Sequence, residues 1–287
     1  MLEVIVYPKE ARRRPWEMIF VGLLYSSLSF LIVNWIFAQD VVLSRYSGLL
    51  VVMFSVLFSI TFIYYSIRLD ERKNIKDKSE IKAIYDDWKI LSMFLYLFVG
   101  FIIGFTFWQV IIPSHINFNS QIETYCVLNN PLQYENCLDN YKINETIQDI
   151  ETKPQGNFFS IFSNNVYVAI FTLAFALVFG AGVIFLISWN ASVVSSVIAL
   201  SIKYKLSNLP LGLTRFLVHG IPEIAGYFIV AMAGGMTSIA ISNYLRKKIS
   251  KDNLLKIIQR SSYLLIIGII VLAIASLIEI YITPVFF

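Results

Sequence analysis

The sequence contains little charge for its length. Only 15% of its 287 residues are Asp, Glu, Lys or Arg, whereas 57% are hydrophobic. Soluble domains usually carry about 25% charged residues and about 45–50% apolar ones. A chain this apolar cannot hide its hydrophobic surface in a water-facing globule, which excludes a soluble single-domain protein. We expect an all-α, polytopic helical protein embedded in the lipid bilayer of the plasma membrane.

Histidine and cysteine are also scarce, with two residues of each. A membrane zinc hydrolase would need a ligand set such as H-E-x-x-H, which two isolated histidines do not supply. The nucleophile motif G-x-S-x-G and a phosphate-binding glycine loop are missing as well. We therefore expect no enzymatic activity, no metal and no cofactor. The net charge of +4 follows from membrane orientation and requires no nucleic-acid partner.

What the sequence does contain is a series of apolar segments, about seven of them, with six to eight as the expected range. Five are windows of about 20 apolar residues, the length that crosses the hydrocarbon core: Trp16–Ala38, Ser47–Ile67, Ile90–Ile112, Val166–Ser188 and Ser262–Thr283. Between residues 190 and 223 we expect a broken or re-entrant region. It would comprise a short segment at Ala191–Ile202 and an interfacial piece at Leu209–Val218, followed by a helix at Ile224–Tyr244.

Basic residues are distributed unevenly between the loops. They precede the first span (Arg12–Arg14), occur throughout the loop before the third span and lie ahead of the last span (Arg246–Arg260). By contrast, most of the charged residues in the loop 113–165 are acidic. The positive-inside rule then places the N-terminus in the cytoplasm and both the loop 113–165 and the C-terminus outside. We expect two regions: a two-span N-terminal part over 1–89 and a membrane domain over 90–287. The stretch Lys78–Lys89 reads either as an inner interfacial helix or as an extension of the third span.

The outer loop carries both cysteines. Cys126 and Cys137 are close in sequence and lie in a non-cytosolic loop, which favours a disulfide, with two free thiols as the alternative. No second set of metal ligands is spaced nearby. Asn144-Glu-Thr146 fits the pattern of a glycosylation acceptor.

Polar residues interrupt the stretch LVHGIPEIAGYF at 217–228. Gly220 and Pro222 suit a helix break followed by a new helix, because proline at the first helical position lacks only a donor that would be unpaired anyway. Glu223 would then lie at the positive end of the helix dipole. If the turn is helical instead, His219 and Glu223 are four residues apart and could share a proton, as ionisable pairs do in transporters.

Two further polar residues lie within the predicted membrane segments. Small residues also recur in these segments. Asn190 either caps the segment that follows or coordinates a ligand at a helix break. Glu279, near the outer end of the last span, either pairs at the interface or belongs to an intramembrane site. Gly100-Phe-Ile-Ile-Gly104 is a GxxxG pattern, which indicates close helix packing in lipid. Ser250 precedes Leu254 in a pattern that opens a helix.

Several of these stretches together resemble a known family. The runs FGAGVIFLISWNASV (179–193), HGIPEIAGYF (219–228), AGG (233–235) and IEIYITP (278–284) are similar to the stage II sporulation protein M family, over roughly residues 90–287. The resemblance implies an integral membrane protein. In spore-forming bacteria, members act in an engulfment complex with partner membrane proteins that remodel peptidoglycan. It marks Asn190, His219, Pro222, Glu223 and Glu279 as positions to follow.

Two functions remain open from the sequence. The first is a non-enzymatic membrane protein with a scaffold or envelope-remodelling role, which forms a homo-oligomer or a complex with partner membrane proteins. Small-residue helix faces favour this function. The second is a transporter or channel with an ionisable site at His219, Glu223 and Glu279, joined by Asn190.

Overall fold

The protein is all-α over the part that the computed structural model describes, which comprises residues 14–37, 40, 42–60, 80–112, 118–129, 157–179, 183–203 and 209–286. Its helices are η2 (Pro15–Glu17), α2 (Met18–Phe37), η3 (Leu43–Tyr46), an apolar helix at Ser47–Ile60, α4 (Glu80–Ile111), α5 (Asn119–Asn129), α7 (Phe158–Phe179), α8 (Val183–Lys203), α9 (Leu209–Leu245), α10 (Lys251–Leu277), the π-helical turn η6 (Ile278–Ile282) and α11 (Thr283–Phe286).

Five of the described helices are long and apolar enough to cross a membrane: Pro15–Phe37, Trp88–Ile111, Phe158–Leu177, Gly220–Leu245 and Lys251–Ile282. Two shorter apolar helices, Ser47–Ile60 and Ile184–Ala199, complete the set. Each of the seven apolar segments predicted from sequence overlaps a described helix, and the prediction of a polytopic helical membrane protein is confirmed.

The predicted bounds around residue 180 are wrong. The expected fourth span, Val166–Ser188, is divided between α7, which ends at Phe179, and α8, which begins at Val183. A continuous apolar run such as this one carries no local signal of where one helix ends and the next begins. The segment Ala191–Ile202 is consequently not separate but forms the second half of α8.

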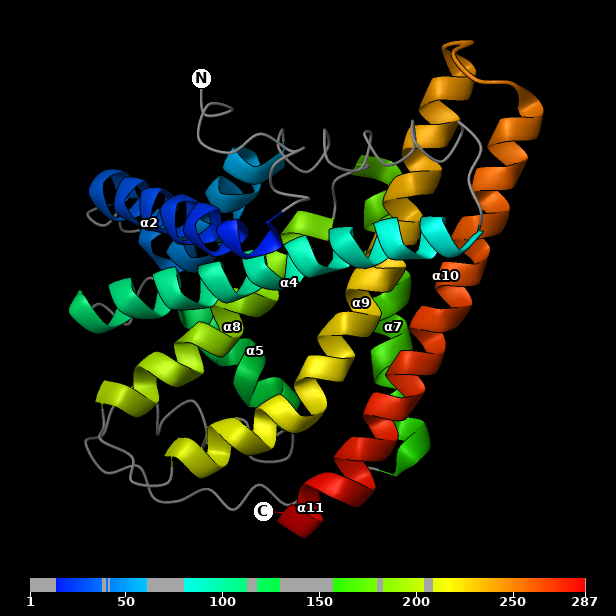
Figure 1. The fold of residues 1–287 in the computed structure, drawn as a ribbon. Coiled ribbons are helices and arrows are strands. Elements are labelled where there is room, and N and C mark those ends of the chain that lie inside the picture. Colours follow the sequence, from blue (N-terminus) through cyan, green and yellow to red (C-terminus); the bar gives the residue numbers. More distant parts are fainter. Residues whose placement is uncertain are drawn as a thin grey trace.

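The expected helix break at Gly220 and Pro222 is also wrong. Helix α9 runs without interruption from Leu209 to Leu245 with Pro222 inside it, and so includes the segment expected to be interfacial. Proline removes one backbone hydrogen bond and bends a helix rather than always ending it. In Figure 1 the early part of α9 runs in a different direction from its later part, so the irregularity appears as a bend.

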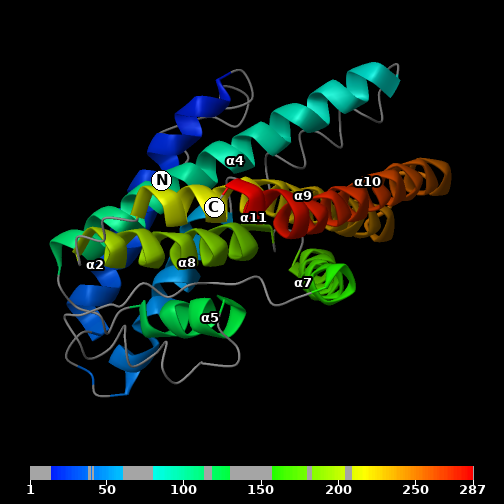
Figure 2. The same ribbon diagram turned by 90° about the horizontal axis from the view of Figure 1, so that it is seen from below.

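Small residues set the distance between α2 and α4. A Cβ atom built on Gly100 would lie 3.0 Å from the Cα atom of Gly22 and would overlap the carbonyl oxygen of Ile19. One turn later, a Cβ atom on Gly104 would overlap the Ser26 hydroxyl, which itself donates to the Gly22 carbonyl at 2.7 Å. The GxxxG prediction is confirmed, and its partner is α2, which lies against α4 in Figures 1 and 2.

Helices α9 and α10 form a long hairpin (Figure 1). The turn between them contains Lys247 in the left-handed region, with φ of 55°. Lys248 N–H donates to the Asn243 carbonyl at 2.8 Å, which closes the end of α9. Ser250 then caps α10 by accepting from Asn253 N–H, as its sequence position predicts.

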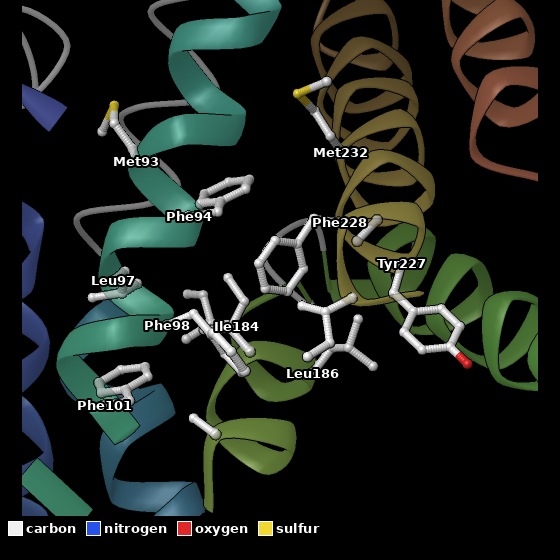
Figure 3. Packing of buried hydrophobic residues seen from close by; sticks show 14 of the residues in the cluster. Met93, Phe94, Leu97, Phe98, Phe101, Ile184, Leu186, Tyr227, Phe228 and Met232 are labelled. Atoms are coloured by element: carbon white, nitrogen blue, oxygen red, sulfur yellow. The ribbon is translucent and has the colours of Figure 1, made fainter. Parts of the chain in front are cut away.

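The hydrophobic core joins the N-terminal helices to the later ones. Phe228 of α9 contacts two rings of α4 edge to face, Phe94 at 6.4 Å and Phe98 at 5.9 Å between centroids. Figure 3 shows these rings between α4 and α9, close to Ile184 of α8. Because α4 is a single helix from Glu80 to Ile111, the stretch before its apolar part is a helical extension of the third span from Glu80 onward.

Candidate functional site

The polar side chains of α9 meet those of α7 and α10 at one place in the apolar interior. Glu223 and Tyr227 lie four residues apart and therefore on the same face of α9. The Tyr227 hydroxyl donates to Oε1 of Glu223 at 2.6 Å. Tyr227 is 3% exposed, and in Figure 3 its ring points away from Phe228 and the α4 rings, toward α7.

Asn165 of α7 and Ser276 of α10 extend this contact into a chain across three helices. Oδ1 of Asn165 lies 3.0 Å from the Tyr227 hydroxyl, and its Nδ2 lies 3.3 Å from Oγ of Ser276. The Ser276 hydroxyl donates in turn to the Leu272 carbonyl at 2.9 Å. Asn165 and Ser276 are 3% and 0% exposed. Interhelical hydrogen bonds of this kind contribute about 0.6 kcal/mol each in membrane proteins, so their main effect here is to fix which faces meet.

A second carboxylate approaches from the end of α10. Glu279 lies in the π-helical turn η6 and interacts electrostatically with Tyr227. Single π-helical turns are rare and often occur at functional sites, because the extra residue re-aims the side chains around it. We define the polar cluster as Asn165, Glu223, Tyr227, Ser276 and Glu279.

Close helix packing brings this cluster together. A Cβ atom on Gly226 would lie 2.7 Å from a methyl group of Leu272, and one on Gly268 would lie 2.7 Å from a methyl group of Val230. These paired glycines hold α9 against α10 just beside the cluster. Gly234 makes the corresponding approach to Leu173 and Ala176 of α7.

The structure does not bring all the predicted site residues together. Glu223 and Glu279 both belong to the polar cluster, and Gly220 and Pro222 lie within the helix that carries it. Asn190 does not cap a helix; it lies inside α8, and its Nδ2 donates to the Leu186 carbonyl at 2.9 Å. His219 lies on α9 four residues before Glu223, but its side chain is outside the described residues, as are those of Cys126, Cys137 and Asn144.

Sequence reasoning missed Asn165, Tyr227 and Ser276. Tyr227 carries a local signal, since it follows Glu223 by one helical turn. Asn165 is the second residue of an Asn pair at the start of an apolar run, which gives a weaker signal. Ser276 carries none, because single serines are common in apolar helices and bond their own backbone.

A second interhelical polar contact joins α4 to α8. Nε2 of Gln109 donates to the Ser195 hydroxyl at 2.9 Å, and Ser195 donates to the Ser192 carbonyl. Three neighbouring serines of α8, Ser188, Ser192 and Ser196, are buried on this side of the helix as well. Among the described residues no group of three metal-ligating side chains comes together, here or in the polar cluster.

Comparison with known proteins places this architecture in context. The family model described as Stage II sporulation protein M matches residues 18–284, which includes the first spans and is wider than the resemblance at 90–287. An uncharacterized protein of Methanocaldococcus jannaschii is 36% identical over 132 residues, which cover 45% of this chain and 72% of that protein. No solved structure matches the chain.

Proposed function

Because the chain belongs to the stage II sporulation protein M family, we propose that it is a non-enzymatic membrane scaffold that assembles with itself or with partner membrane proteins. The proposal rests on how much of each membrane-spanning helix is buried by the rest of the protein, since this share differs greatly between helices. Within the protein, 78% of the Gly220–Leu245 window is buried, against 17% for Phe158–Leu177 and 22% for Lys251–Ile282. Helix α9 is thus the centre of the fold, whereas α7 and α10 present large outer faces.

The outer face of α7 is not uniformly apolar. Ser160, Ser163, Asn164 and Tyr167 lie at helical spacing and are exposed, Tyr167 by 72%. Amide and hydroxyl groups that face hydrocarbon lack hydrogen-bond partners, which is costly, and polar residues in membrane helices therefore tend to face other helices. This strip, hereafter the α7 polar strip, supports α7 as the assembly face. The exposed face of α10 carries isoleucines instead, among them Ile266 and Ile270, as expected for contact with lipid.

The test is site-specific photo-crosslinking in native membranes. A photoreactive amino acid at Tyr167 is expected to give a crosslinked protein product, whereas the same group at Ile270 on α10 is the matched control and should react with lipid. Asn164→Leu should reduce the Tyr167 product several-fold. Equal yields at the two positions, or a monomer alone in mild detergent with no product from either, would contradict the proposal.

We also propose a plasma-membrane topology with the N-terminus in the cytoplasm and both the outer loop and the C-terminus outside. The sequence predicts this outer loop over 113–165, but the predicted end is wrong, because helix α7 already begins at Phe158. The turn between α9 and α10 supports the topology, because Arg246, Lys247, Lys248 and Lys251 are all exposed there. In a chain with both native cysteines replaced by serine, a cysteine at Lys247 should resist a membrane-impermeant maleimide in intact cells. A cysteine at Val285, which is 79% exposed, should react. The opposite labelling pattern would reverse the orientation.

A further inference from the structure

The polar cluster contains more acceptors than donors around one hydroxyl group. The Tyr227 hydroxyl has a single hydrogen, yet Oε1 of Glu223 lies 2.6 Å away and Oδ1 of Asn165 lies 3.0 Å away. One hydrogen cannot serve both oxygens. A second hydrogen must therefore come from a protonated Glu223, or the Asn165 amide must present its NH2 group instead.

With a proton on Glu223, all the hydrogen bonds run in one direction. Glu223 donates to Tyr227, Tyr227 donates to Oδ1 of Asn165, Nδ2 of Asn165 donates to Ser276, and Ser276 donates to the Leu272 carbonyl. The placement of the Asn165 amide, with its oxygen toward Tyr227 and its nitrogen toward Ser276, fits this arrangement.

Without that proton, the same atoms form a chain that runs the other way. Tyr227 donates to the Glu223 carboxylate, the Asn165 amide is turned so that its Nδ2 donates to Tyr227, and the Ser276 hydroxyl donates to Oδ1 of Asn165. One proton leaves, the Tyr227 and Ser276 hydroxyl hydrogens turn, and the Asn165 amide exchanges its oxygen and nitrogen positions by rotation about its Cβ–Cγ bond. The Leu272 carbonyl then loses the Ser276 hydroxyl and retains its bond within the α10 helix.

We propose that the Glu223 carboxyl is a reversible proton-binding site, and that gain or loss of this proton reverses the hydrogen bonds that join α9, α7 and α10. Asn165 is the residue that permits the reversal, since an amide can present either an acceptor or a donor to the same neighbour. The proposal concerns the interior of one chain and stands apart from assembly through α7.

Two titratable residues of the described part, Tyr227 and Glu279, belong to the site around Glu223. Tyr227 of the same helix contacts it directly, and Glu279 of η6 interacts with Tyr227. The only titratable residue of α7, Tyr167, lies on the exposed face away from the cluster, and α11 carries no titratable side chain. His219 lies one turn earlier on α9, and its side chain is outside the described residues.

Infrared difference spectroscopy of the full chain in lipid nanodiscs tests the proposal. The spectrum at acid pH minus that at alkaline pH should contain a carbonyl band of a protonated carboxyl. That band should be lost in Glu223→Gln and retained in the matched control Glu279→Gln. Glu223→Gln should remain folded, because its amide can donate to Tyr227 as the protonated carboxyl does.

Tyr227→Phe provides an independent measurement in which Glu223 is still present. The carboxyl band should remain but change frequency, because its hydrogen-bond acceptor is gone, whereas Tyr263→Phe on the outer face of α10 should leave the frequency unchanged. A band that survives in Glu223→Gln, disappears in Glu279→Gln, keeps its frequency in Tyr227→Phe, or is absent from the wild type would overturn the proposal.

Discussion

At the scale of single residues, one tyrosine hydroxyl connects the polar groups of three helices. Tyr227 is only 3% exposed, and its hydroxyl lies between α9 and α7. Its hydroxyl lies within hydrogen-bond distance of Oε1 of Glu223 and of Oδ1 of Asn165. A buried polar group that loses its partner costs more than the net value of the hydrogen bond itself.

Tyr227→Phe is therefore expected to lower the stability of the protein by about 1–3 kcal/mol. The Glu223 carboxyl and the Asn165 amide oxygen each lose the hydrogen bond that they make with this hydroxyl, while the aromatic ring is preserved. Thermal unfolding in detergent, followed by loss of helical circular dichroism, would measure the change. Tyr263→Phe is the control, since that hydroxyl lies on an exposed face, where it accepts from Gln259, and it should change stability by less than about 0.5 kcal/mol.

Gly100→Ala tests close packing at the same scale. The added methyl group would overlap the Ile19 carbonyl, so α2 and α4 must move apart, and overpacking of this kind costs about 1–3 kcal/mol. Val99→Ala, on the exposed side of the same turn, is the control and should be close to neutral. Equal effects of the two substitutions in the unfolding assay would argue against the close α2–α4 contact.

At the scale of elements, the α9–α10 hairpin contains one residue in an unfavourable backbone conformation. Lys247 has a φ of 55°, and this region costs a residue with a Cβ atom about 1–2 kcal/mol. Lys247→Gly should therefore stabilise the protein by about 1 kcal/mol, since glycine adopts positive φ freely. The neighbouring Lys248→Gly should not stabilise it. The free energy of unfolding of both variants, measured by chemical denaturation, tests this prediction. A lower stability of Lys247→Gly would contradict the turn geometry.

The start of α10 gives a second prediction for this hairpin. The Ser250 side chain accepts from Asn253 N–H, so Ser250→Ala should cost about 1 kcal/mol through loss of the cap. Ser250→Asp should retain the stability, because its carboxylate can accept the same bond. Hydrogen exchange of the first turn of α10 would localise the effect, and equal exchange in all three proteins would exclude a capping role.

At the scale of the whole molecule, a small set of aromatic contacts joins the N-terminal helices to the α7–α9–α10 unit. Phe228 is fully buried and packs against α4. Phe228→Ala should destabilise the protein by about 3–5 kcal/mol, because it removes a large buried ring and leaves a cavity. Phe171→Ala, on the exposed face of α7, is the size-matched control and should cost much less in the same unfolding assay.

Features that depend on local composition are predictable from the amino-acid sequence. Low charge and long apolar runs are enough to predict a helical membrane protein, and each of the seven apolar segments overlaps a described helix. Gly100 and Gly104 indicated a close crossing, and Ser250 indicated the start of α10. These signals are readable because each arises within one or two turns of chain.

The pairing of segments that are distant in the chain depends on how the helices pack together. Pro222 reads as the start of a helix in sequence, yet packing of α9 at the centre of the fold keeps it inside a continuous, bent helix. Asn165 and Ser276 lie 62 and 111 residues from their partners in the chain, and no local pattern relates them. Their pairing follows from helix faces that approach closely at Gly226 and Gly268, and this approach is a property of the packed bundle rather than of any one helix.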